Sequence, residues 1–169
     1  MIPLLPYKQL VFESPLSQEE VIRRLTLEVA KPRSGLQWLE RRTEKFEGTV
    51  SEEGFQIKRI IRYRNSFLPI IQGRFSSLGK GVRIEVTLKL HIVALIFSLI
   101  WVGFVGRMAV AVIPQILTTG RVEGGGGILC AMLIFFYLLV TIGFGIEANK
   151  ASKLLSSLFD ADDSRAKKV

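Results

Sequence analysis

The densest cluster of basic side chains in the polar part of the chain lies in the segment KRIIRYRNSFLP. Lys58, Arg59, Arg62 and Arg64 fall within seven residues, and Asn65 follows them directly. Ammonium and guanidinium groups at this spacing can bind anionic lipid headgroups, a phosphorylated ligand or an acidic protein. The same residues also fit a solvated strand face that ends in an Asn-led turn, so both interpretations stay open.

Three lysines extend this candidate surface beside the apolar part of the chain. Lys89 precedes the first apolar stretch, and Lys150 and Lys153 follow the second one. Basic residues that flank membrane spans lie at headgroup level. The candidate contacts to anionic headgroups or to a protein partner are therefore Lys58, Arg59, Arg62, Arg64, Asn65, Lys89, Lys150 and Lys153.

The residue sets that usually carry catalysis or bind metals are missing from the sequence. His91 is the only histidine and Cys130 the only cysteine, so neither a Cys/His metal set nor a thiol–base pair can form within one chain. The segment Gly79-Lys80-Gly81 lacks the spacing of a phosphate-binding loop and fits a hairpin turn. We therefore predict a non-enzymatic protein with no catalytic residue, metal ligand or cofactor.

Two long apolar stretches set the surroundings of these side chains. The second, 128–146, holds 19 residues without a charge, close to the roughly 20 that cross a hydrocarbon core. The first starts at residue 92 and is interrupted by Arg107, but a helix over 92–112 is long enough to cross. We predict a transmembrane hairpin with these two spans and an outer loop over 113–127.

The distribution of basic residues predicts the orientation of this hairpin. Of the 23 Lys and Arg residues, 16 precede His91 and 5 follow Ile146. Because positive charge is retained on the cytoplasmic side, we predict that both termini are cytoplasmic. Arg107 would lie near the outer interface, where its guanidinium can snorkel to headgroups.

The polar segment 1–91 is long enough for one small α+β domain. A first strand is predicted near 8–13, and Ser17 with Glu20 forms a capping box that starts a helix. Four strands with period-two alternation follow, and the last, 82–90, alternates most clearly. The pattern predicts a small antiparallel sheet with one wet face and one buried face, which the N-terminal helix can cover.

The segment 147–169 is predicted to begin as a helix and to end in a disordered tail. Its apolar stripe consists of Ala151, Leu154, Leu155, Leu158 and Phe159. This stripe can dock on the sheet or lie in the membrane surface. We predict docking, because a five-stranded sheet with a single helix leaves apolar area uncovered.

Several motifs of the polar segment are similar to those of a known group of proteins. They are Phe46-Glu47-Gly48, Phe55, RNSFLP at 64–69, and Gly73. Over most of the polar domain and the hairpin, the chain resembles a family of bacterial two-span membrane proteins of unknown function, with cyanobacterial members. The resemblance implies a bacterial inner or thylakoid membrane and assigns no catalytic residue.

These observations favour an interaction or assembly module anchored at the cytoplasmic face of a membrane. The alternative is a lipid or small-ligand binder with a pocket between the sheet and the C-terminal helix, and with Arg64 and Asn65 at its mouth. The order strand, helix, strands, helix is similar to that of helix-grip binding folds, an analogy only. The net charge of +8 comes with no nucleic-acid recognition motif. The expected partners are therefore membrane lipids and a membrane or acidic protein, and no nucleic acid.

Overall fold

The computed structural model describes residues 6–31, 43–61, 63–79, 81–120 and 125–161. Within these residues the protein is α+β, as predicted, with six strands and three helices. In chain order the elements are β1 (Tyr7–Ser14), α1 (Gln18–Glu28), β2 (Val29–Ala30), β3 (Phe46–Val50), β4 (Gly54–Arg59), β5 (Pro69–Leu78), β6 (Gly81–Leu90), α2 (Ile92–Thr119) and α3 (Gly126–Leu158).

All six strands form one sheet in the order β1-β6-β5-β4-β3-β2. The pairs β1-β6, β6-β5, β5-β4 and β4-β3 are antiparallel, as expected. The two-residue β2 pairs with β3 in parallel and makes the sheet mixed. A strand of two residues is too short to show an alternating pattern, which is why the sequence does not reveal it. In β6 the predicted alternation is confirmed, since Val82, Ile84, Val86, Leu88 and Leu90 are all buried.

Helix α1 begins where the capping residues predict. The hydroxyl of Ser17 accepts a hydrogen bond from the backbone N–H of Glu20 at 3.3 Å, which satisfies one of the first-turn donors. Val21 and Leu25 are fully buried against the sheet core, so α1 covers one part of the apolar face.

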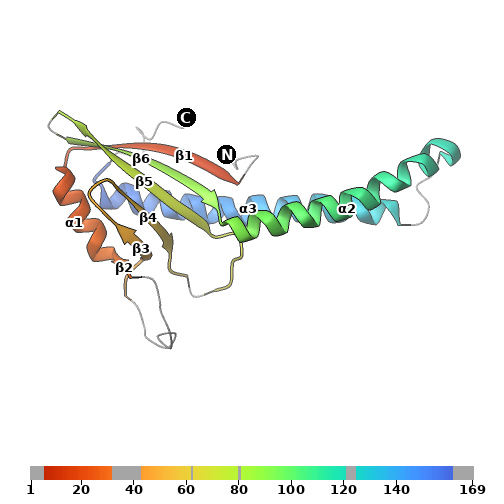
Figure 1. Ribbon diagram of the computed structural model, residues 1–169, viewed down its shortest axis with the longest axis horizontal. Coiled ribbons are helices and arrows are strands. Elements are labelled where there is room, and N and C mark those ends of the chain that lie inside the picture. The colour runs from red at the N-terminus through yellow and green to blue at the C-terminus, as the bar shows by residue number, and fades with distance from the viewer. Residues whose placement is uncertain (1–5, 32–42, 62, 80, 121–124, 162–169) are drawn as a thin grey trace.

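Helix α3 covers most of the rest of that face and is the central element of the fold. It runs without a break for 33 residues, first beside α2 and then along the sheet (Figure 1). Phe144, Ala148, Ala151 and Leu155 are completely buried among the sheet side chains, and so is Phe159 just after the helix. The predicted docking of the C-terminal helix is therefore confirmed.

Two of the helices are long and apolar enough to cross a membrane. Only 6% of the most apolar stretch of α2 and 17% of that of α3 are buried inside the protein. The core helix of a soluble protein would be mostly buried. Helix α2 continues through Pro114 to Thr119, so the helical hairpin is longer than the predicted spans and takes up part of the predicted outer loop.

Candidate membrane-interface site

A buried carboxylate lies where α3 passes from its apolar stretch into the sheet. Glu147 has only 1% of its side chain exposed, and it accepts hydrogen bonds from Arg59 at the end of β4 and from Tyr63 just beyond. A third donor is the ammonium of Lys150, with its Nζ 3.2 Å from Glu147 Oε1. An ionised carboxylate is buried at a tolerable cost only when it is paired in this way. The cluster therefore fixes α3 to the end of β4.

Lys150 connects this cluster to the protein surface. Its ammonium also donates to the Tyr63 hydroxyl at 3.3 Å and lies 5.5 Å from the centre of the Tyr63 ring. The hydrogen bonds to Tyr63 and to Glu147 raise the pKa of Lys150 above its ordinary value. The ammonium thus stays charged over the physiological pH range.

A second set of contacts holds α3 from the opposite side, through β1. Lys8 Nζ donates to Asn149 Oδ1 at 3.0 Å and to Ser152 Oγ at 3.2 Å. Farther along, the Ser14 hydroxyl donates to the carbonyl of Phe159 at 2.5 Å. The helix is therefore held by polar contacts from the edge strand β1 and from the end of β4, in addition to the apolar core.

The loop between β4 and β5 contacts the apolar part of α3. Asn65 Oδ1 accepts from the backbone N–H of Phe67 at 2.9 Å, which is the predicted Asn-led turn, and its Nδ2 donates to the carbonyl of Gly143 at 3.2 Å. The Phe67 ring packs edge-on against Phe136, which in turn stacks on Trp101 of α2. The loop thus connects the sheet to both apolar helices.

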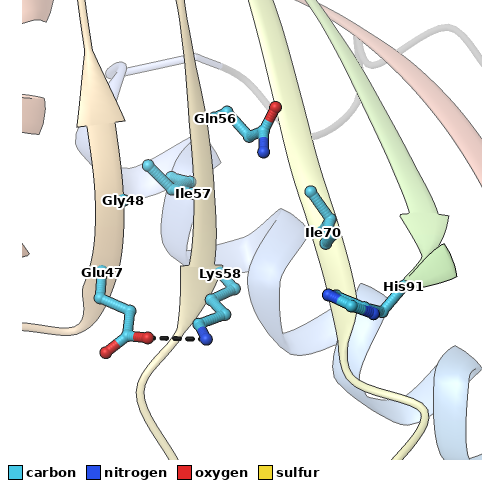
Figure 2. A pocket seen from close by; sticks show the side chains of 7 residues that line it. All are labelled: Glu47, Gly48, Gln56, Ile57, Lys58, Ile70 and His91. Carbon is cyan, nitrogen blue, oxygen red and sulfur yellow. Dashed lines mark ion pairs between the residues drawn. The ribbon is translucent and has the colours of Figure 1, made fainter. Parts of the chain in front are cut away.

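Three hollows surround the junction between β6 and α2. The first, about 220 Å³, lies on the open face of the sheet and contains the ion pair of Lys58 with Glu47 at 2.7 Å (Figure 2). The second, about 570 Å³ and called here the interface groove, is lined by Ser66, Phe67, His91, Val93, Ala94 and Phe97. The third, about 490 Å³, lies beside the start of β1 and is lined in part by Lys89 and Leu95.

None of these three hollows is lined by α3, so none is the pocket that we expected between the sheet and the C-terminal helix. That space is filled by the core, because large side chains of the sheet and of α3, such as Ile57 and Leu155, belong to one buried cluster and have at most 2% of their surface exposed. The small residues Ala148 and Ala151 bring the helix close to the strands. The three hollows lie instead on the open face of the sheet, beside α2 and beside the start of β1.

The predicted basic residues are spread over different surfaces. Arg59 faces α3 and binds Glu147, Lys58 lies on the other face with Glu47, and Asn65 binds the backbone of α3. Arg64, Lys89 and Lys153 are exposed, Lys150 pairs with Glu147, and Arg107 is exposed on α2. Arg62 lies outside the described residues. Headgroup contacts by the exposed members of this set stay a prediction.

Several residues of this site were not identified from the sequence. These residues contact partners that are far away in the chain; Arg59 and Glu147, for example, are 88 positions apart. The residues missed are Glu147, Tyr63, Lys8 and Phe67. A usable signal did exist for Arg59. It has the same strand parity as the buried Phe55 and Ile57, so an inward-facing arginine that needs an acidic partner could have been predicted.

The described residues contain no group of three or more His, Cys, Asp or Glu side chains that could hold a metal ion. The chemistry of the site is that of charged and aromatic contacts at the junction between a sheet and two apolar helices. Comparisons of the chain with protein-family models, with curated proteins and with solved structures find no match.

Proposed function

We propose that this protein is a non-enzymatic integral membrane protein whose α+β domain is an interaction or assembly module, held rigidly at the cytoplasmic face of a bacterial inner or thylakoid membrane. The observation that carries the proposal is the continuity of α3, which is one 33-residue helix shared by the apolar hairpin and the core of the domain. A flexible linker would let the domain swing, whereas a shared helix fixes its orientation relative to the bilayer.

The polar contacts support the same conclusion. Three contacts each attach a different part of the sheet domain to α3: Arg59 with Glu147, Lys8 with Asn149, and Asn65 with Gly143. Such fixed attachment suits a protein that presents one surface to a partner. The open face of the sheet, opposite the two covering helices, is a surface of this kind and carries both acidic and basic side chains.

The orientation can be tested with a reporter. A periplasmic-type reporter enzyme inserted after Gly124, between the two apolar helices, is expected to be active, whereas the same reporter placed after Val169 is expected to be inactive. The physical reason is the excess of Lys and Arg on both flanks of the hairpin, which retains those flanks in the cytoplasm. A cytoplasmic location of the Gly124 reporter would contradict the proposed topology.

The alternative function is binding of a lipid or small ligand. The interface groove favours it, because its volume of about 570 Å³ lies within the range of roughly 300–1,000 Å³ that ligand pockets occupy. In this case the relevant cavity is the groove beside α2 and not a space under α3.

A photo-crosslinking experiment in native membranes separates the two functions. Benzoylphenylalanine is placed at Gln72 or Arg74 on the open face, with Thr26 on the exposed side of α1 as the matched control. We expect a single protein partner that crosslinks from the open-face positions and co-purifies in mild detergent at about equal molar amount. A chain that yields no protein partner, but carries a lipid or metabolite, would support the alternative instead.

A further inference from the structure

We infer that the interface groove holds one membrane phospholipid, with its phosphodiester at His91 and Ser66 and an acyl chain between Phe67 and Phe97. The inference rests on the membrane anchoring proposed above. It does not depend on whether the protein acts through a protein partner or through a ligand, because a bound lipid is compatible with both.

Along α2, from His91 toward the apolar part of the helix, the lining of the groove changes from polar to apolar. A lipid leaflet changes in the same direction, from its headgroups to its acyl chains. His91 directly precedes α2, and Phe97 lies six positions further on, about 9 Å deeper along the helix axis. Val93 and Ala94 lie between these two levels. The wall opposite is Phe67, which the Asn65 turn holds against Phe136. A phospholipid has the same sequence of a charged headgroup above an apolar chain.

The polar end of the groove is built to donate hydrogen bonds. His91 Nδ1 accepts the backbone N–H of Val93 at 3.2 Å, which leaves Nε2 as the ring nitrogen that can donate to a ligand. Ser66 adds a hydroxyl donor. Arg64 is exposed two residues before Ser66 and contributes positive charge on the same loop. A phosphodiester, which is anionic and only accepts hydrogen bonds, complements these groups.

The apolar end of the groove requires an apolar occupant. Phe97 and Val93 are more than half exposed within the protein, and Phe97, about 9 Å deeper than His91, would lie among acyl chains that exclude water. An empty apolar groove would lose dispersion contacts along both walls. A lipid acyl chain restores these contacts, and Phe67 on the far wall restricts where that chain can lie.

The inference is tested by a substitution that fills the groove with a larger side chain, followed by a count of the lipid molecules that stay bound to the chain. The full-length chain is purified in mild detergent, incubated with phosphatidylglycerol and examined by native mass spectrometry. We expect about one phospholipid per wild-type chain, and roughly tenfold less retained by Ala94→Phe, a loss that corresponds to about 1.4 kcal/mol. Ala111→Phe, the same change at an exposed alanine of α2, is the control and should match the wild type. Equal retention by the two variants would overturn the inference.

A second arm tests the headgroup and leaves the groove open. The double variant Ser66→Ala, His91→Leu is expected to lower the affinity for phosphatidylglycerol roughly 10- to 100-fold, because two hydrogen bonds to a charged phosphate are lost. Diacylglycerol with the same acyl chains should bind the wild type as weakly as phosphatidylglycerol binds this variant. Equal affinity of the wild type for both lipids would overturn the phosphodiester assignment. A chain that stays monodisperse in buffer without any amphiphile would instead overturn the membrane anchoring itself.

Discussion

Replacing Glu147 by alanine is expected to destabilise the protein by about 3–5 kcal/mol, because it leaves the Arg59 guanidinium buried without its counter-charge. The Arg59 side chain is only 16% exposed, so water can replace the lost carboxylate only in part. For a chain of this size the loss corresponds to a decrease of roughly 6–20 °C in the midpoint of thermal unfolding. Scanning calorimetry of the full-length chain in detergent measures it directly.

Two further variants make this expectation specific to the buried cluster. Glu85→Ala removes an exposed carboxylate whose partner Arg83 is 3.5 Å away, and it should cost less than about 1 kcal/mol. The double variant Arg59→Met, Glu147→Leu removes both charges and should recover most of the loss, since an apolar pair can replace a buried ion pair at little cost. If Glu147→Ala costs no more than Glu85→Ala, the cluster does not fix α3 to the sheet.

The second large effect is expected at Gly48 in β3. Its φ is +151°, and an added Cβ would lie 2.1 Å from the carbonyl oxygen of Gln56 and 2.7 Å from Ile57 Cα, both backbone atoms of β4. Strain in this backbone region costs about 1–3 kcal/mol, and forcing the two strands apart costs a similar amount. We therefore expect Gly48→Ala to lose about 2–6 kcal/mol of unfolding free energy, measured by the same calorimetry.

Gly79 provides the matched control for this substitution. Its φ is also positive, at +56°, but an added Cβ would meet no atom within 4 Å. Gly79→Ala should therefore lower the free energy of unfolding by only about 1–2 kcal/mol, the cost of the left-handed backbone conformation. Equal losses for the two variants would show that β3 and β4 can separate locally and that the close approach at Gly48 is not required.

The residues on which the family resemblance rests have structural tasks in this fold. Phe46 and Phe55 are core residues, and an added Cβ at Gly73 would collide with the Phe55 ring. Gly48 allows β3 and β4 to approach, and Asn65 forms the turn that contacts α3. These positions explain why the sheet and the loop take their shape. The family membership itself stays a prediction.

Local patterns were sufficient for much of the architecture. Alternation predicted β6, a capping box predicted the start of α1, and an apolar stripe predicted that the end of α3 packs on the sheet. The extent of β4 was predicted less well. The segment FQIKRIIRY at 55–63 predicts a strand as far as Tyr63, but β4 ends at Arg59, and the Tyr63 hydroxyl instead donates a hydrogen bond to Glu147.

For the site, strand parity indicates that Arg59 faces inward but does not identify its partner. The carboxylate and the arginine of the site become neighbours only when α3 docks, and nothing in the segment around Arg59 specifies that contact. The interface groove likewise depends on the position that the Asn65 turn gives to Phe67 relative to α2. Hollows between segments that are distant in sequence follow from tertiary packing, which periodicity does not encode.

The shared helix α3 also has a consequence for biosynthesis. All six strands precede α3 in the chain, so the ribosome makes the core side chains at the end of α3, such as Ala151 and Leu155, only after both apolar stretches. Until then the strands lack the helix that covers most of their apolar face, and an exposed apolar face of this kind is prone to aggregation. If the two apolar helices span a membrane as proposed, a chain that failed to insert the second one would also leave the sheet without its covering helix, so a fault in insertion would also be a fault in folding.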